Sequence, residues 1–319
     1  MQIPLRRLVA LIVCLTSCLT LSDSAWTQGK TRGTGVTGLQ SSVEQAMSDR
    51  PGAAVVIDVA TSKVLAAYHP GVAAQRVALP GSSIKPFTLM ALLEAGKIND
   101  QTMLMCKRPL TIAGHQLSCS HPDVKQPFDP ATALAYSCNS YFSSVATRLT
   151  PTELRDSFVK YGFTSPSGLA SYEANGTVTL AGTQADLQLE AIGEEGVRVT
   201  PLELLRAYQQ IALLTEKHEP KLAPLFVGLE GSVAYGMGHL AQPDTAMKVA
   251  GKTGTSVVEE GSWRHGWFAG YAPADKPEIA LVVFLENGHG PTDAANTARK
   301  IFAAYAASRK PSSSHGAAR

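Results

Sequence analysis

The sequence has little charge, and the charge it has is nearly balanced. Only 17% of its 319 residues are Asp, Glu, Lys or Arg, and the net charge is +2. It also has no basic stripe interleaved with aromatic side chains, which is the pattern typical of nucleic-acid binding. Because 45% of the residues are hydrophobic, the chain can bury a large core. We therefore expect a globular protein that binds no nucleic acid.

Several well-known catalytic motifs are absent as well. The sequence contains neither the Gly-x-Ser-x-Gly of α/β-hydrolases nor the His-Glu-x-x-His of zinc peptidases. The segment Ala246–Thr253 resembles a phosphate-binding loop, but Ala246 stands where the first glycine is required and no helix is predicted after it. The eight histidines are scattered along the chain and indicate no ligand set. We expect neither a metal nor a cofactor.

The longest predominantly apolar run lies near the N-terminus. It extends from Leu8 to Leu21 behind two arginines, which is the layout of a secretory signal and is short for a membrane span of about 20 residues. Two interpretations stay open, an ordinary cleavage site at Ser22-x-Ser24 or a bacterial lipobox over Leu15–Cys18. We expect residues 1–24 to be a signal peptide or lipoprotein signal. The protein would then act in the periplasm or at the outer face of the cytoplasmic membrane, where a lipid anchor would hold it on the membrane surface.

Cysteine is scarce, with five residues, of which three follow the signal. Cys106 and Cys119 flank Pro109–Leu117, which predicts two short strands around an Ala-Gly turn, so the pair would face each other across a hairpin. We predict a disulfide between them, since an oxidising compartment permits one. Cys138 is then left as a buried free thiol, because no histidine lies in a context typical of a cysteine protease.

The hydrophobic pattern predicts a sheet built from both ends of the chain with a helical block inserted between them. The predicted elements are, in chain order, a helix at 39–47, strands at 53–58 and 63–68, a helix at 82–95, helices at 130–146, 151–161 and 201–214 with a loop over 162–199, a short helix near 230–240, strands at 248–255, 263–271 and 278–286, and a helix at 294–307. Composition predicts a linker over 25–38 and a disordered tail over 308–319.

A short stretch, Pro80–Phe87, predicts a helix start that carries a serine and a lysine. Ser82 fits an N-cap or first-turn position, and Gly96 marks the helix end. One helical turn places the Ser82 hydroxyl and the Lys85 amine on the same face, and the strongly apolar remainder predicts a buried helix. Burial would lower the pKa of Lys85 until its amine can accept a proton. On this motif alone a capping serine with a surface lysine is favoured, since Ser157–Lys160 repeats the pattern.

Two further motifs favour the alternative, in which Ser82 is a nucleophile. Ser137-Cys138-Asn139 lies in the helical block, Lys252-Thr253-Gly254 lies on a predicted strand, and each occurs once. The order Ser-x-x-Lys, Ser-x-Asn, Lys-Thr-Gly is typical of serine acyl-transferases that react with D-Ala-D-Ala peptides and β-lactams. The sequence therefore resembles the transpeptidase domain of penicillin-binding proteins. Gly196–Leu204 and Trp267–Tyr271 are also similar to family segments, and the resemblance covers about residues 40 to 307.

The resemblance implies an α+β fold in which helices flank an antiparallel sheet and an all-α lobe is inserted, with the site between the two lobes. It implies a transpeptidase-like catalytic domain over residues 39–307. In that domain Ser82 would attack the carbonyl of the penultimate D-Ala, with neutral Lys85 as its base. Ser137 would pass a proton to the leaving amine, and Asn139 would orient Lys85 and the substrate amide.

The resemblance gives the Lys-Thr-Gly strand the task of binding substrate. Lys252 would add positive potential, and the hydroxyls of Thr253 and Thr255 would hydrogen-bond the terminal carboxylate, with Gly254 between them. The backbone N–H groups of Ser82 and Thr255 would form the oxyanion hole. The chain departs from the family at Gly193-Glu-Glu-Gly196, where an uncharged residue often replaces one of the glutamates.

Three functions share this scaffold, namely a peptidoglycan D,D-transpeptidase or carboxypeptidase, a serine β-lactamase, and a non-catalytic β-lactam sensor. The Glu-x-x-Leu-Asn segment that one β-lactamase class uses for deacylation is absent, and the class with a modified lysine tends to have Val where Asn139 stands. A sensor would usually carry a long transmembrane signalling region, which the sequence does not show. We therefore expect a penicillin-binding serine D,D-transpeptidase that acts on peptidoglycan stem peptides and takes β-lactams as covalent inhibitors.

Overall fold

The structure, a computed structural model, describes residues 36–258 and 263–309. All of them lie within one compact unit. The predicted signal over 1–24, the linker up to residue 35 and the tail beyond residue 309 lie outside the described residues. Within the described part, the helices are all too short or too polar to cross a membrane.

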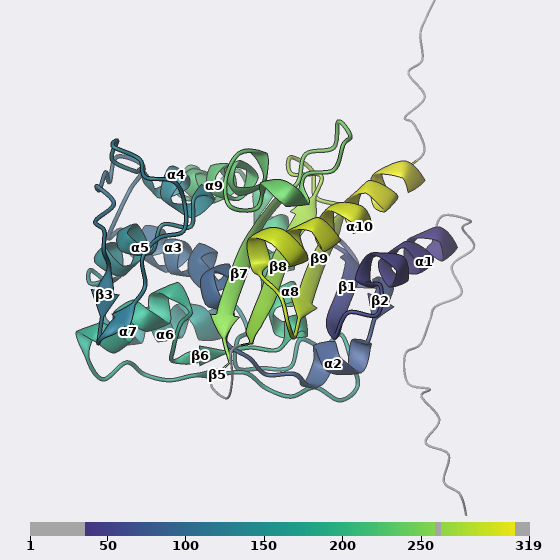
Figure 1. Cartoon of the computed structure of the whole chain (residues 1–319), viewed down its shortest axis with the longest axis horizontal. Coiled ribbons are helices and arrows are strands. Elements are labelled where there is room, and N and C mark those ends of the chain that lie inside the picture. The colour runs from purple at the N-terminus through teal and green to yellow at the C-terminus, as the bar shows by residue number, and fades with distance from the viewer. Residues whose placement is uncertain (1–35, 259–262, 310–319) are drawn as a thin grey trace, which may run out of the picture. The chain divides into compact units, whose positions relative to one another are not determined.

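Both ends of the described chain contribute to one five-stranded antiparallel sheet, in the order β2-β1-β9-β8-β7 (Figure 1). Its strands are β1 (Gly52–Asp58), β2 (Val64–Tyr68), β7 (Ala250–Val257), β8 (Arg264–Ala272) and β9 (Ile279–Leu285). The central strand β9 is buried along its whole length and consists only of apolar residues. Such a continuous apolar strand requires cover on both faces of the sheet.

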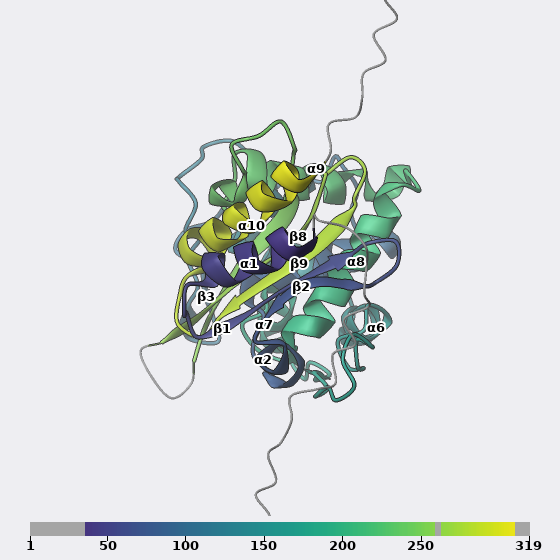
Figure 2. The ribbon, with the colours of Figure 1, turned by 90° about the vertical axis from the view of Figure 1, so that its right-hand side faces the viewer.

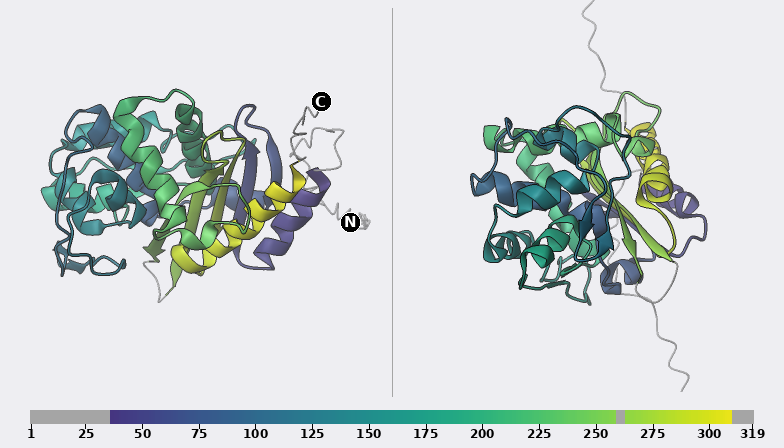
Figure 3. Two further views of the ribbon diagram at one scale, coloured as in Figure 1. Left: turned by 90° about the horizontal axis from the view of Figure 1, so that it is seen from above. Right: turned by 60° about the vertical axis from the view of Figure 1, so that its left-hand side comes forward.

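Helices provide that cover. The first and last helices, α1 (Val36–Met47) and α10 (Ala295–Ser308), lie side by side on one face (Figures 2 and 3), and α8 (Pro201–Thr215) packs on the other. Alternate residues of β9 belong to the cores on opposite faces of the sheet, because successive side chains of a strand point to opposite faces. Val283 belongs to the core shared with α1 and α10, and Val282 to the core shared with α8.

Between β2 and β7 the chain forms mainly helices, which pack beside the sheet as the predicted inserted lobe. The remaining elements are α2 (Pro70–Gln75), η1 (Gly81–Ile84), α3 (Lys85–Glu94), β3 (Thr111–Ile112), β4 (His115–Gln116), α4 (Pro130–Ala135), α5 (Asn139–Ala146), α6 (Pro151–Lys160), β5 (Thr177–Val178), α7 (Gln184–Ile192), β6 (Val197–Arg198), η2 (Pro220–Leu222), α9 (Ala223–Ala234), η3 (His239–Ala241) and η4 (Gly290–Ala294). Helix α3 is buried over nearly its whole length, as its apolar sequence predicts. The predicted α+β fold is confirmed.

The helix predicted at 130–146 is wrong as a single element. Helix α4 ends at Ala135 and α5 begins at Asn139. Between them Ser137 has a left-handed backbone, with φ 57°, and Cys138 has an extended one. A non-glycine residue seldom adopts positive φ, and neither glycine nor proline marks this break in the sequence. The break leaves Ser137 between the two helices and Asn139 at the first position of α5, and both residues contact the lysine of α3.

The loop predicted over 162–199 also contains a helix. Thr183 and Asp186 form a capping box at the start of α7, and Gly193, with φ 80°, follows its last turn. Both are sequence signals of a helix, so this element was predictable. Two boundaries differ as well. The helix expected from Ser82 begins as the 3₁₀ turn η1 and becomes α-helical at Lys85, and the helix expected near 230–240 starts earlier, as α9.

The turn η1 and the edge strand β7 approach each other closely. Gly81 has φ 52°, and a Cβ there would overlap the carbonyl of Thr255. A Cβ on Gly254 would overlap the carbonyl of Pro80 and would lie 2.9 Å from the backbone nitrogen of Ser83. Only glycine allows two backbones to lie this close, which explains the glycine of the Lys-Thr-Gly motif.

This packing predicts that Gly254→Ala destabilises the fold. We expect the free energy of unfolding to fall by about 1 to 3 kcal/mol, because the added methyl group must displace backbone atoms. Gly71→Ala is the matched control, since a Cβ there would meet nothing within 4 Å and its backbone is helical. Urea unfolding of both variants measures the difference. Equal stabilities for the two would contradict the close approach.

Candidate active site

Ser82 occupies the second position of the turn η1 and is half-buried. The next residue fixes the turn, because the Ser83 hydroxyl donates to the Pro80 carbonyl at 2.7 Å and the Tyr208 hydroxyl donates to the Ser83 carbonyl at 2.8 Å. Among the residues that the structure describes, none forms a hydrogen bond with the Ser82 hydroxyl. A fixed turn thus presents a hydroxyl group that is open to a substrate.

Lys85 begins α3 and is completely buried. Its amine Nζ donates to Asn139 Oδ1 at 2.5 Å and to the Ser137 carbonyl at 2.8 Å, and it lies 3.3 Å from the Ser137 hydroxyl. The first two sequence motifs, which are about 50 residues apart, therefore meet at one amine. This contact requires the break between α4 and α5.

Burial lowers the pKa of the Lys85 amine to about 8, and the nearby side chains of Cys119, Cys138 and Glu194 partly oppose that shift. Desolvation dominates because a charged ammonium group without water is unfavourable. At pH 8 about half of these amines are therefore neutral. A neutral amine has a lone pair, so it can accept a proton from a neighbouring serine hydroxyl.

The Asn139 side chain is held from both ends. Its amide nitrogen donates to the Leu117 carbonyl at 2.9 Å, and its oxygen accepts from Lys85. The carbonyl of Leu117 belongs to the loop after β4, so the β3–β4 hairpin supports the Ser-x-Asn turn. The amide therefore has its nitrogen on the hairpin and its oxygen on the amine, which fixes the direction in which Lys85 points.

The third motif lies on the edge strand β7. Lys252 is completely buried, and its amine donates to the Thr253 carbonyl at 3.0 Å. Burial together with the charge of Lys85 lowers the pKa of the Lys252 amine well below its usual value. Thr253 is only 2% exposed, whereas Thr255 is partly exposed and its hydroxyl oxygen accepts from the Gly290 N–H at 3.0 Å. Of the two predicted carboxylate-binding hydroxyls, Thr255 is the more accessible.

A cavity of about 530 Å³ adjoins these residues. Its lining residues are Leu79, His115, Gln116, Leu117, Leu189, Glu194, Glu195, Gly196, Arg198 and Val257. Ser82 is not among them, and the links to the candidate site are Leu117, whose carbonyl accepts from Asn139, and Leu79, which precedes the turn η1 by two residues. The size of the cavity suits a small ligand or part of a peptide. The sequence predicted the hairpin at β3–β4, but not that it forms a wall of this cavity, because that arrangement is made by contacts between distant parts of the chain.

The second Ser-x-x-Lys pattern has a different environment. Ser157 and Lys160 lie on α6, where the Lys160 amine pairs with the Glu94 carboxylate at 2.8 Å and is 58% exposed. An exposed, paired ammonium group is a poor base. Only the pattern at Ser82 therefore combines a half-exposed hydroxyl with a buried amine.

The predicted disulfide is not formed in this structure. Cys106, Cys119 and Cys138 all carry free thiols. The Sγ atoms of Cys106 and Cys119 are 3.6 Å apart, whereas a disulfide bond is about 2.05 Å long. The predicted hairpin does bring the two cysteines together, but Cys138 and His121 reach the same point, so the thiols surround a common centre instead of forming one pair.

Comparison with known proteins identifies the family of the chain. The model of the penicillin-binding protein transpeptidase domain matches residues 52–305. Peptidoglycan D,D-transpeptidase MrdA of Acinetobacter baumannii is 25% identical in an alignment 359 residues long, gaps included, which covers 86% of this chain and 53% of that protein. Peptidoglycan D,D-transpeptidase FtsI of Escherichia coli K12 is 27% identical over 280 residues, covering 74% and 47%. The chain thus spans about half the length of the curated relatives it matches.

Solved structures share the fold. PBP2 of Pseudomonas aeruginosa, in complex with WCK 5153, has a TM-score of 0.73 and 22% identity, over 84% of this chain and 76% of the other. The transpeptidase domain of penicillin-binding protein 3 of Burkholderia pseudomallei has a TM-score of 0.72 and 21% identity, over 84% and 91%. The architecture is therefore that of a penicillin-binding transpeptidase domain. With the family model matching most of its length, the chain belongs to the penicillin-binding protein transpeptidase family.

The buried Lys85 amine predicts a pH-dependent stability. In the unfolded chain this lysine keeps its usual pKa of 10.5, so between about pH 8 and that value the unfolded state binds more protons and stability rises with pH. In Lys85→Met this gain is missing. We expect the wild type to gain about 2 to 3 kcal/mol relative to Lys85→Met between pH 7 and pH 10, as measured by urea unfolding. A constant difference between the two proteins would refute the lowered pKa.

Proposed function

We propose that this chain is the catalytic part of a penicillin-binding serine D,D-transpeptidase, which cross-links peptidoglycan through an acyl-enzyme on Ser82. The observation that carries the proposal is the buried amine of Lys85, three residues after the half-exposed Ser82 and held by Ser137 and Asn139. Membership of the transpeptidase family supports it. The curated relatives are themselves named peptidoglycan D,D-transpeptidases.

In the proposed reaction, the Ser82 hydroxyl oxygen attacks the carbonyl carbon of the penultimate D-Ala, and the neutral Lys85 amine takes its proton. The backbone N–H groups of Ser82 and Thr255 stabilise the negative oxygen that forms. When the intermediate collapses, the peptide C–N bond breaks and Ser137 passes a proton to the departing D-Ala amine. The acyl ester on Ser82 is then transferred to the amine of a second stem peptide, which restores the serine hydroxyl.

Substrate binding falls to the edge strand in this proposal. The hydroxyl of Thr255 would receive the terminal carboxylate, with the backbone of Thr253 and Gly254 alongside. The negative charge of a bound carboxylate would in turn favour the protonated, positive form of the buried Lys252 amine. β-Lactams would enter as covalent inhibitors, because their strained amide presents a carbonyl and a carboxylate to the same groups. The cavity lined by Leu117 and Val257 offers room for the rest of the stem peptide.

We extend the proposal to the parts of the chain outside the described residues. Residues 1–24 would direct export as a signal peptide or lipoprotein signal, and residues 25–38 would link that signal to a catalytic domain over 39–307. The reaction would then take place in the periplasm or at the outer face of the cytoplasmic membrane, where peptidoglycan is found. The support for this is the N-terminal sequence pattern together with the peptidoglycan chemistry named for the relatives.

The first test is labelling by a fluorescent penicillin. We expect Ser82→Ala to lose labelling while its fold persists, because the Ser82 side chain caps neither η1 nor α3 and its hydroxyl forms no hydrogen bond among the described residues. Ser157→Ala is the matched control, because it removes the serine of the second Ser-x-x-Lys pattern, and it should be labelled like the wild type. Peptide mapping by mass spectrometry locates the adduct. An adduct on Ser157, or full labelling of Ser82→Ala, would contradict the assignment of Ser82 as the nucleophile.

The second test is the lifetime of the acyl-enzyme. The sequence has no segment recognised as supplying a deacylating base, so we expect loss of label over minutes to hours. A good β-lactamase deacylates in milliseconds, and the gap of roughly four to five decades in rate corresponds to a barrier about 5 to 7 kcal/mol higher.

The variant Glu194→Gln is the control for the measurement of the acyl-enzyme lifetime. The carboxyl group of Glu194 interacts electrostatically with the Lys85 amine and burial raises its pKa, so we take it as the candidate for activating water. We expect Glu194→Gln to leave the slow loss of label unchanged. Rapid turnover of penicillin by the wild type that disappears in Glu194→Gln would favour the β-lactamase alternative.

A further inference from the structure

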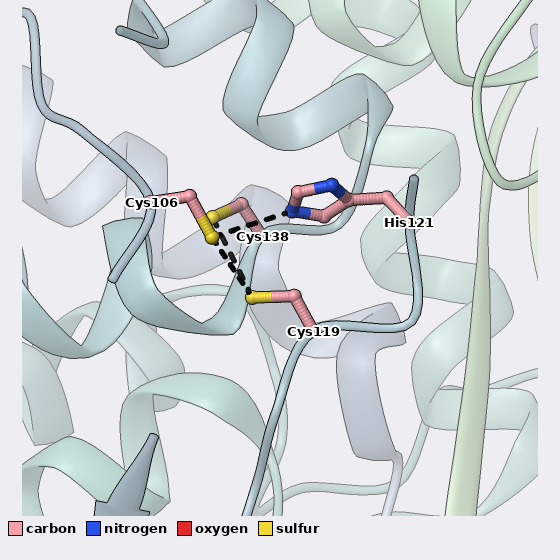
Figure 4. A group of neighbouring side chains, drawn as sticks. All are labelled: Cys106, Cys119, His121 and Cys138. Atoms are coloured by element: carbon pink, nitrogen blue, oxygen red, sulfur yellow. Dashed lines mark hydrogen bonds between the residues drawn. The ribbon is translucent and has the colours of Figure 1, made fainter. Parts of the chain in front are cut away.

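Four side chains that the proposed reaction does not use converge on one point beside the active site. They are Cys106, Cys119, His121 and Cys138, and their sulfur and ring-nitrogen atoms all lie within 4.8 Å of one another (Figure 4). Three of the four residues are buried and Cys106 is partly buried. They come from two separate stretches, the loop that carries the β3–β4 hairpin and the turn before α5.

The spacing of these atoms is that of ligands around a metal. Four ligands in a tetrahedron, with Zn–S near 2.3 Å and Zn–N near 2.0 Å, lie about 3.5 to 3.8 Å from one another. Here the Sγ atoms of Cys106 and Cys119 are 3.6 Å apart, and those of Cys119 and Cys138 are 3.7 Å apart. His121 Nε2 is 3.7 Å from the Cys106 sulfur. A disulfide would bring only two sulfurs together, much more closely, and would give the imidazole no reason to face them.

We propose that Cys106, Cys119, His121 and Cys138 bind one Zn²⁺ ion as a closed structural site. Three thiolates and an imidazole are soft and borderline donors, which favour zinc over magnesium or calcium. Each thiol loses its proton to solvent on binding, so three thiolates and Zn²⁺ leave one net negative charge. Because all four positions are filled by protein, the ion has no open position for a substrate.

Neighbouring groups are arranged to support these ligands. His121 Nδ1 lies 2.7 Å from the Pro122 carbonyl, which favours the proton on Nδ1 and leaves the Nε2 lone pair toward the sulfurs. The backbone N–H groups of Ser140 and Tyr141 donate to the sulfurs of Cys119 and Cys138, each at 3.4 Å. Such bonds stabilise thiolates at metal sites.

A cation also lies at the edge of the cluster. Arg108 Nη2 donates to the His121 carbonyl at 2.7 Å and lies 2.8 Å from Nδ1 and 3.2 Å from Nε2. Zinc would displace the guanidinium from both ring nitrogens, because the ion would take Nε2 and the proton on Nδ1 would face the Pro122 carbonyl. The guanidinium would stay on the His121 carbonyl, where its positive charge offsets the negative charge of the loaded site.

The site has a consequence for the proposed active site, and this part rests on the proposed function. Cys138 stands between Ser137 and Asn139, and both of these neighbours contact Lys85. A metal bound to Cys138 would therefore hold the turn that contains all three residues. The other three ligands anchor that turn to the loop whose Leu117 carbonyl accepts from Asn139. Zinc would therefore position the Ser-x-Asn motif without taking part in the chemistry.

The test is the metal content of the full chain, purified under reducing conditions after growth with added zinc. We expect about one zinc per chain by mass spectrometry of the metal, and at least a fivefold loss in Cys106→Ser and in His121→Asn. His218→Asn is the matched control, because His218 is exposed and outside the cluster, and it should retain the full zinc content. Circular dichroism shows which variants are folded.

A second measurement does not depend on the variants. Co²⁺ added to the metal-free wild type should give the intense sulfur-to-metal absorption of tetrahedral thiolate coordination, and added zinc should remove it. The proposal is overturned if reduced wild type binds neither ion, if His121→Asn keeps its zinc, or if the native protein holds a Cys106–Cys119 disulfide and no metal. Penicillin labelling is measured on the same samples. Zinc without labelling would overturn the proposed function alone, and labelling without zinc would overturn the metal site alone.

Discussion

The whole arrangement depends on one buried amine. Lys85 lies at the start of a helix that is enclosed by the core on nearly every side, and its three contacts all go to the Ser-x-Asn turn of another element. Burying a lysine without a full counter-charge costs free energy, and the lowered pKa is the measure of that cost. A protein keeps such a group where a neutral amine is useful, and in this chain the amine belongs to the residue one turn after the half-exposed Ser82.

The rest of the fold serves to hold that amine and that hydroxyl together. The sheet, built from both ends of the chain, provides a rigid edge at β7, and Gly254 lets the turn with Ser82 lie directly against it. The helical lobe supplies Ser137 and Asn139, and the β3–β4 hairpin fixes Asn139 through the Leu117 carbonyl. The zinc site that we propose would fasten the same hairpin loop to the same turn. Its position explains why three cysteines surround a motif whose chemistry requires none of them.

Much of this could be predicted from the sequence, and the failures have physical causes. The strands and the buried helix α3 followed from runs of apolar residues, and the resemblance of three motifs pointed to the family. The break at Ser137 was hidden, because a left-handed serine is imposed by tertiary contacts and not by local preference. Helix α7 was missed although Thr183 and Asp186 form a capping box. The cysteines were interpreted as a pair plus a leftover because Cys138 and His121 join them only in three dimensions.

The central claim is that a neutral Lys85 amine activates Ser82. Its most direct test is the second-order rate of Ser82 acylation by penicillin as a function of pH, measured from pH 6 to pH 9.5 by intact-protein mass. Below its pKa of about 8 the amine is mostly protonated, so the rate should rise about tenfold for each pH unit and level off above that pKa. A rate that stays flat over this range, or that falls with rising pH, would contradict the account.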